Sequence, residues 1–184
     1  MISAALALTL SLSSTPVVPD DSLYLLDSTF VDQLGEQRTL DVHRGKPVLL
    51  AMFYATCPSA CPRLIADVQR VLGQLDDKQR RQVRVVLVSL DPVRDTADVL
   101  AKVIVTRGLD RERTTLLVGT ESDTRRLAAL LGVKYREDGK GAIDHSSRIV
   151  VLDRLGRIAG KRDGLGGSVD DTVATLEQVL ASRK

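Results

Sequence analysis

Four short apolar runs along the chain have the length and composition of buried β-strands. The clearest is PVLLAMFY at residues 47–54, which is apolar without interruption and therefore typical of a strand that is covered on both faces of a sheet. Similar runs lie at residues 82–90, 114–118 and 148–152. The pattern predicts a parallel or mixed sheet with a thoroughly buried centre.

The segments between these runs show the spacing of amphipathic helices. In residues 60–75 the apolar side chains fall on one face, and they are Leu64, Val68, Val71, Leu72 and Leu75. Further helices are predicted at residues 95–106, 121–131 and 168–181. Strands that alternate with helices imply right-handed crossovers and an α/β fold.

Two hairpins complete the predicted order of elements. Residues 23–26 and 38–42 flank a polar stretch that contains Gly35, which suggests an N-terminal β-hairpin. Residues 153–156 (DRLG) join the strand-like runs 148–152 and 157–161 into a second hairpin. The order hairpin, βαβαβ, α, ββ, α fits a thioredoxin-like fold with an N-terminal β-hairpin extension, and we expect residues 20–184 to form it as one domain.

The opening of the chain has a different character. Residues 2–12 are apolar but shorter than the roughly 20 residues that span a bilayer, and a Ser/Pro-rich linker follows them up to residue 19. We therefore interpret residues 1–19 as the remnant of an export signal with its linker, which predicts a periplasmic or other extracytoplasmic location. The basic part of such a signal is incomplete because no Lys or Arg precedes Arg38. The alternative is a short buried N-terminal segment.

Composition and charge narrow the class of partner. The chain has 184 residues, of which 43% are hydrophobic and 3% aromatic, with no Trp and a net charge of +2. The basic clusters at residues 78–84 and 107–113 are interleaved with acidic or polar residues, as expected of solvated helix ends. With few aromatic side chains to stack on bases, nucleic acid is not an expected partner.

The only two cysteines, Cys57 and Cys61, directly follow the first buried strand, at the start of the first helix. Ligands gather at the carboxyl ends of strands in an open α/β sheet, and a helix N-terminus stabilises a thiolate, so we expect Cys57 to be the more acidic thiol. A spacing of four residues puts the Cα atoms about 6 Å apart in a helix, so a disulfide and a metal chelate are both feasible. Pro62 fits only in a first helical turn, which places the helix start near Ala60.

Three interpretations of the pair compete. The first is a structural disulfide, but it would close a loop of only five residues and so constrain the unfolded chain very little. The second is a pair of buried thiols without a chemical role. Soft thiolates instead favour Cu(I) and leave room for a nitrogen ligand. Only His43 and His145 can supply an imidazole. His43 precedes the first strand, at the end opposite Cys57, and is expected to be a solvated loop residue; His145 lies in the loop before residues 148–152, and spacing alone does not decide its role.

Three separated motifs occur in the order that a known family shows. The segments FYATCPSACP at residues 53–62, SLDPVRDT at 89–96 and DHS at 144–146 resemble the Sco/SenC family of copper-binding thioredoxin-like proteins. The resemblance runs from about Leu23 to the last helix. It implies that Cys57 and Cys61 match the two copper-binding thiols of the family, that His145 matches its distal imidazole, and that the metal is copper as Cu(I), Cu(II) or both.

The resemblance also implies a task. Members of the family mature the dinuclear copper centre of cytochrome c oxidase by delivering copper, by reducing the cysteines of the target, or both. The expected function is thus that of a copper metallochaperone, and the expected partner is the copper-bearing subunit of the oxidase or another periplasmic copper protein. The N-terminal signal or anchor of the family is incomplete here, so attachment to a membrane would need a segment that is missing from this sequence. Asp91 and Arg94 match the family's Asp-Pro-x-Arg-Asp-Thr loop, and Asp95 or Thr96 either caps the next helix or contacts the metal.

Two enzymatic alternatives use the same cysteines. In a thiol-disulfide oxidoreductase Cys57 would attack and Cys61 would resolve, although such enzymes usually have two residues between the cysteines. Thioredoxins also place a cis-proline opposite the thiols, whereas no Pro follows Pro92 here and His145 falls near the expected position. In a thiol peroxidase Cys57 would form a sulfenic acid. The spacing and the missing Pro favour metal binding without forbidding dithiol chemistry.

Overall fold

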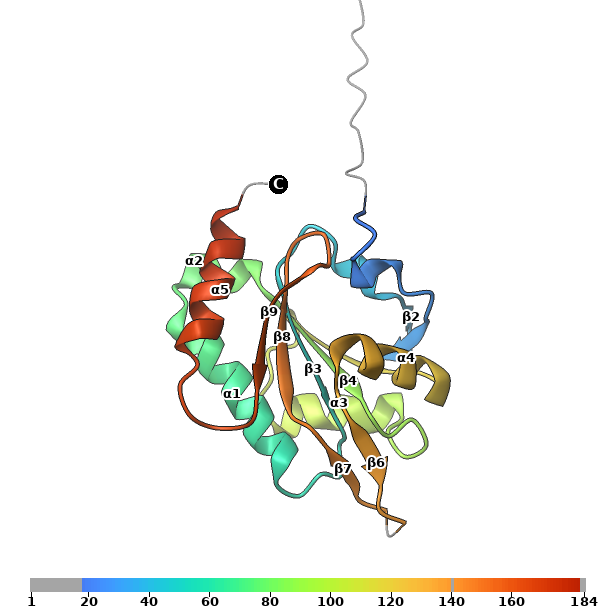
Figure 1. Ribbon diagram of the computed structural model, residues 1–184. Coiled ribbons are helices and arrows are strands. Elements are labelled where there is room, and N and C mark those ends of the chain that lie inside the picture. The colour runs from blue at the N-terminus through green and yellow to red at the C-terminus, as the bar shows by residue number, and fades with distance from the viewer. Residues whose placement is uncertain (1–17, 140, 183–184) are drawn as a thin grey trace, which may run out of the picture.

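The centre of the structure, a computed structural model that describes residues 18–139 and 141–182, is a mixed seven-stranded sheet (Figure 1). The strand order is β2-β1-β5-β4-β3-β8-β9. The strands of this sheet are β1 (Phe30–Asp32), β2 (Gln37–Arg38), β3 (Val48–Phe53), β4 (Arg84–Ser89), β5 (Thr114–Val118), β8 (Arg148–Leu152) and β9 (Ile158–Asp163). The arrangement confirms the predicted α/β class and all four buried strands.

Strand β3 lies in the middle of the sheet because every one of its side chains is apolar. Each of its six residues is buried. It pairs in parallel with β4, where Phe53 lies opposite Ser89, and antiparallel with β8, where Ala51 lies opposite Ile149. The antiparallel pairing brings the start of β8 beside the carboxyl end of β3. Segments that are far apart in the sequence therefore meet at that edge of the sheet.

The described residues form five α-helices around the sheet. They are α1 (Ala60–Gln74), α2 (Asp77–Gln82), α3 (Ala97–Thr106), α4 (Glu121–Leu131) and α5 (Asp170–Ala181). Helices α1 and α5 pack side by side, and α3 packs along β5 and β1 (Figure 1). Four of the helices match the predicted segments to within two residues, and α1 begins at Ala60 as the position of Pro62 predicts.

The N-terminal hairpin exists, but it is built from other residues than predicted. Residues 23–26 do not form a strand: Leu23–Leu25 is a 3-10 helix, η1, whose first turn is capped by the hydroxyl of Ser22. The hairpin consists of β1 and β2, which pair across a turn at Gly35, where φ is +82°. Residues Leu40–His43 form a second 3-10 helix, η2, in place of the predicted strand. Strand β1 continues the main sheet by pairing antiparallel with β5.

A separate two-stranded sheet, β6 (Tyr135–Glu137) and β7 (Ile143–His145), projects beyond the carboxyl edge of β3 (Figure 1). It was not predicted from the sequence, because its strands are three residues long and mostly polar. In its register Tyr135 lies opposite His145. His145 is therefore the last residue of a strand and not a residue of a loop.

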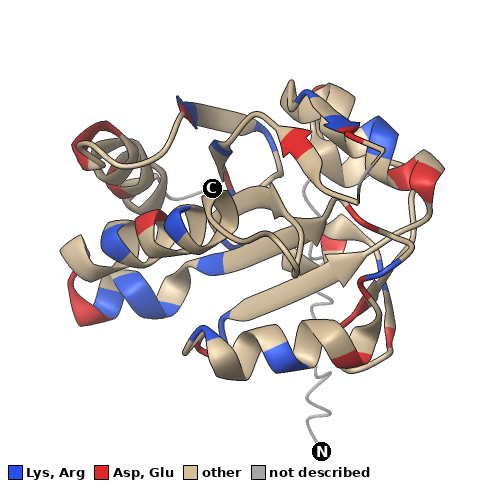
Figure 2. Cartoon of the chain, turned by 90° about the horizontal axis from the view of Figure 1, so that it is seen from below, with Lys and Arg blue, Asp and Glu red and all other residues tan. Residues whose placement is uncertain are grey.

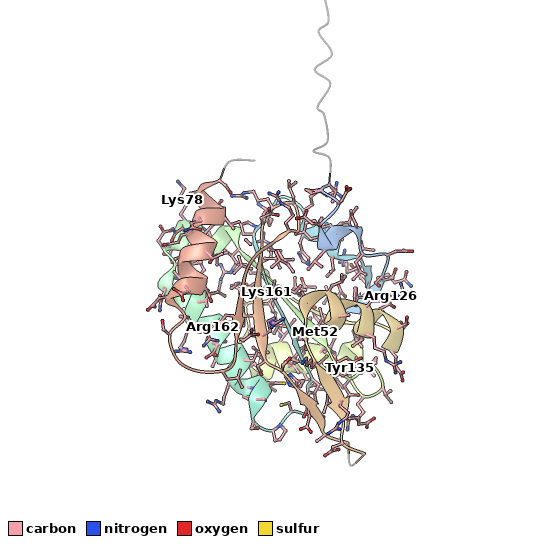
Figure 3. The ribbon with its side chains drawn as sticks, viewed as in Figure 1. Met52, Lys78, Arg126, Tyr135, Lys161 and Arg162 are labelled. Atoms are coloured by element: carbon pink, nitrogen blue, oxygen red, sulfur yellow. The ribbon has the colours of Figure 1, made fainter. Side chains whose placement is uncertain are left out.

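Among the described residues, most charged side chains lie on the surface, although four aspartates, Asp32, Asp67, Asp91 and Asp95, are buried. Lys and Arg stand next to Asp and Glu over the helices and loops in Figure 2. In Figure 3, Lys78 at the start of α2 points outward, whereas Met52 of β3 lies in the core and is 1% exposed. The interpretation of residues 1–17 as an export signal lies outside the described residues. Within the described part of the chain, no helix has the length and apolarity needed to cross a membrane.

Candidate metal centre

The turn between β3 and α1 holds both cysteines. Cys57 lies in the turn and Cys61 in the first turn of α1, and their side chains are buried. Neither is in a disulfide. The backbone N–H of Cys61 donates to the sulfur of Cys57 over 3.2 Å, and the backbone N–H of Tyr54 donates to the sulfur of Cys61 over 3.4 Å. A free N–H group at the start of α1 thus points at the sulfur of Cys57, as expected for a thiol that is stabilised as a thiolate.

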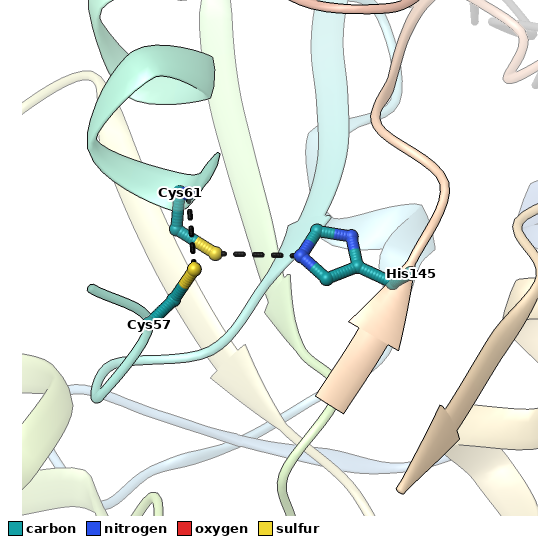
Figure 4. Close-up of side chains that lie close together, drawn as sticks. All are labelled: Cys57, Cys61 and His145. Atoms are coloured by element: carbon teal, nitrogen blue, oxygen red, sulfur yellow. Dashed lines mark hydrogen bonds between the residues drawn. The ribbon is translucent and has the colours of Figure 1, made fainter. Parts of the chain in front are cut away.

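His145 faces this turn from β7 (Figure 4). Its Nε2 lies 3.6 Å from the sulfur of Cys61. Its Nδ1 lies 3.2 Å from the carbonyl oxygen of Ser146, which fits a protonated Nδ1 that donates to this oxygen and leaves the lone pair of Nε2 toward the thiols. The ligand atoms of Cys57, Cys61 and His145 all lie within 4.8 Å of one another.

The two thiols differ in acidity in the predicted direction. Burial alone would raise the pKa of Cys57, but hydrogen bonds from the backbone and thiol of Cys61, the backbone of Ser59 and the hydroxyl of Tyr54 outweigh burial and lower this pKa. Burial strongly raises the pKa of Cys61, and the negative charges of Cys57 and Asp95 add to the effect. Cys57 is therefore the thiol that ionises first.

The donor set fits a soft metal ion. Ligand atoms that bind one ion at about 2.0–2.3 Å in a plane stand roughly 3.5–4 Å apart, which small side-chain movements provide here. Burial lowers the pKa of His145, so its imidazole is neutral at pH 7, as a ligand must be. Two thiolates and one imidazole form the kind of site that Cu(I) favours, and such a set also suits zinc.

His43 lies outside this cluster, and the expectation that it is solvated was wrong. It ends η2 before β3, is 9% exposed, and its Nε2 has no hydrogen-bond partner among the described residues. Burial and the positive charges of Arg84 and Arg38 lower its pKa to about 4. The fold buries this side chain, which the polar loop sequence did not indicate.

The loop between β4 and α3 packs against the turn that carries Cys57. Thr96 caps α3 by accepting from the backbone N–H of Val99, as expected, but Asp95 is not a cap. The carboxylate of Asp95 is buried and accepts from the hydroxyl of Ser89 over 2.5 Å and from the backbone N–H of Ala55 over 3.0 Å. Asp95 therefore holds the turn that carries Cys57, a role that the sequence signalled only by placing Asp95 after a buried strand.

The same loop contacts the hairpin that carries His145. Asp91 pairs with Arg94, and Arg94 also donates to the carbonyl oxygen of Gly141 in the β6–β7 connection. Tyr54 adds a second contact between the halves of the site, since its ring packs edge-on against the His145 ring with centroids 5.8 Å apart. Tyr54 was missed from the sequence, where it is only the last apolar residue of the PVLLAMFY run.

These observations define a class of protein: a thioredoxin-like domain in which two cysteines and one histidine form a candidate metal site at the carboxyl end of a buried interior strand. The family model described as SCO1/SenC matches residues 22–181. The chain therefore belongs to the SCO1/SenC family, as its three motifs indicated.

Similar proteins agree with this assignment. The "Putative copper-binding protein" of Stutzerimonas stutzeri is 27% identical over 145 residues, which cover 73% of this chain and 70% of the relative. The structure of Bradyrhizobium japonicum ScoI with copper bound is 25% identical, covers 83% of this chain and 96% of its own, and superposes with a TM-score of 0.65. The structure of BsSco, a member of the Sco family of cytochrome c oxidase assembly proteins, covers 90% of this chain and 99% of its own with a TM-score of 0.73; at 20% identity it supports the fold.

Proposed function

We propose that the chain binds one copper ion between Cys57, Cys61 and His145 and delivers it to another copper protein. The recipient that we propose first is the copper-bearing subunit of cytochrome c oxidase. The observation that carries the proposal is the convergence of two sulfur atoms and one imidazole nitrogen within 4.8 Å, although His145 is 84 residues from Cys61 in the sequence. Family membership and the copper-bound relative support copper over zinc.

The chemistry of the site suits a carrier. Copper is the cargo, and a site made of two cysteines from one turn and one histidine from a separate hairpin can open by movement of that hairpin. The short β6–β7 sheet is not part of the seven-stranded sheet. A partner that offers its own ligands could therefore take the ion without unfolding the domain.

The decisive variant is His145→Ala. Loss of an inner ligand should weaken Cu(I) binding by more than the tenfold to hundredfold that is typical of outer-shell changes, and competition with a Cu(I) chelator measures it. The matched control is His43→Leu, which removes the other imidazole of the chain at the opposite end of β3 and should leave copper affinity unchanged. Equal affinity of the His145→Ala variant and the unaltered protein would refute the proposed site.

Dithiol reductase activity is a second candidate function, and the acidity of the thiols favours it. A lowered pKa at Cys57 and a raised pKa at Cys61 match an attacking and a resolving thiol. In a reductase the His145→Ala variant should change the rate of insulin disulfide reduction only modestly. Unchanged copper affinity together with a largely retained reductase activity in this variant would favour the enzyme over the carrier.

We further propose an extracytoplasmic location, supported by the apolar residues 2–12 and the reactive thiol pair. Fractionation of cells that express the gene from its natural start tests the location. Recovery of the protein in the cytosol alone would contradict it.

A further inference from the structure

Tyr54 contacts both sides of the Cys57–Cys61–His145 cluster. It directly follows β3 and is 4% exposed. Its backbone N–H donates to the sulfur of Cys61 over 3.4 Å. Its ring meets the His145 ring at 77° with centroids 5.8 Å apart.

The hydroxyl of Tyr54 reaches the opposite side of the site. It accepts the backbone N–H of Ile143 over 3.4 Å. Ile143 begins β7, the strand that His145 ends. Tyr54 thus connects the cysteine turn, through its backbone N–H to Cys61, with the histidine strand, through its hydroxyl.

The other tyrosines of the chain have no comparable arrangement. The hydroxyl of Tyr24 is also buried, yet it has no hydrogen-bond partner among the described residues. Tyr135 is half-buried on β6, next to His145 in the two-stranded sheet. The contact of the Tyr54 hydroxyl with β7 is therefore a feature of this position, not a general consequence of burying a tyrosine.

We infer that Tyr54 is a positioning residue for the copper ion: its backbone N–H contacts the sulfur of Cys61, while its hydroxyl and ring hold β7 so that both thiolates and the imidazole reach one metal. The inference rests on the proposed copper site and extends it by one residue.

The test compares three variants. Tyr54→Phe removes the hydroxyl but keeps the ring against His145 and the backbone N–H to Cys61, whereas Tyr54→Leu also removes the ring. Tyr24→Phe is the control, because it deletes a buried hydroxyl without a partner. We expect Tyr54→Phe to weaken Cu(I) binding about tenfold and Tyr54→Leu to weaken it further, as for other outer-shell groups, with Tyr24→Phe unchanged.

Two further measurements separate positioning from a general loss of stability. The visible and electron paramagnetic resonance spectra of the Cu(II)-loaded protein report on the ligands, and we expect them to shift in Tyr54→Phe and not in Tyr24→Phe. The Ile143 amide should exchange with solvent faster in metal-free Tyr54→Phe. Unchanged affinity and spectra in Tyr54→Phe would overturn the positioning role alone. Failure of the unaltered protein to bind copper would overturn the proposed function, and the positioning role with it.

Discussion

His43 is a buried imidazole outside the candidate metal site, and its burial makes the stability of the fold depend on pH. Its pKa is lowered to about 4 in the folded protein, from 6.5 as a free side chain. Between these values the unfolded chain takes up a proton that the folded protein does not, so the free energy of unfolding falls as the pH falls from about 6.5 to about 4. At roughly 1.4 kcal/mol per pH unit, the full loss is about 3 kcal/mol.

Urea unfolding at pH 7 and pH 4.5 measures this loss. We expect the unaltered protein to lose about 2–3 kcal/mol more than His43→Leu, because leucine has no proton to gain. The comparison is repeated with His145→Ala added to both proteins, because the pKa of that histidine is lowered too and its titration also contributes to the loss. Equal losses in the two proteins would show that His43 is not buried as described.

At the scale of single residues, the sequence was sufficient to name the candidate ligands, which the structure brings together, but not the residues that support them. Two cysteines and two histidines leave few choices, and the family motifs separate His145 from His43. The supporting contacts join residues that are far apart in the chain, such as Asp95 with Ala55 and Ile143 with Tyr54. Such pairs depend on how loops meet in space, and no local pattern of polarity or spacing encodes them.

At the scale of elements, helix α1 is fixed to the β9–α5 connection by a buried carboxylate. Asp67 is 3% exposed and accepts from Arg70 over 2.6 Å, from Arg162 over 3.1 Å and from the backbone N–H of Gly166 over 2.8 Å. These groups outweigh burial and lower the pKa of Asp67. The helix whose first turn holds Cys61 is therefore fixed to this connection at Asp67.

We expect Asp67→Ala to lower the free energy of unfolding by about 2–4 kcal/mol, because it leaves the facing N–H groups of Arg162 and Gly166 without their acceptor. The control is Asp77→Ala, whose exposed pair with Arg80 should contribute less than about 1 kcal/mol. Denaturant unfolding measures both. Copper affinity should stay the same in both variants, since Asp67 contacts none of the three ligands; a large loss of affinity would contradict that separation.

The elements that the sequence missed share one property, which is a lack of apolar periodicity. Helix α2 reads DKQRRQ and has no apolar face, but Asp76 and Gln79 form a capping box that marks its start. Strands β6 and β7 are short and mostly polar, so the alternation that reveals a strand is too brief to detect. By contrast, β3 and β4 are almost wholly buried, and continuous apolar runs predict such strands well.

At the scale of the whole molecule, the site lies between two parts of the fold. The cysteines belong to the seven-stranded sheet and its first helix, and His145 belongs to the two-stranded sheet. Described contacts between these parts near the site include the Tyr54 hydroxyl and ring, Arg94 to Gly141, and the burial of Ile143 in the core. A bound copper ion would bridge the same boundary, with two bonds to the cysteines on one side and one bond to His145 on the other.

Copper should therefore stabilise the reduced protein and fix the hairpin. At a free Cu(I) concentration of 100 times the dissociation constant, linkage adds about 2.7 kcal/mol, which raises the melting temperature by roughly 5–10 °C for a domain of this size. Hydrogen exchange should slow most at Ile143, Asp144 and His145, and a Cu(I) chelator should reverse both effects. Protein with an oxidised Cys57–Cys61 pair should show neither effect, because ligation needs both thiolates. An equal rise in melting temperature for oxidised protein would mean that copper binds elsewhere on the chain.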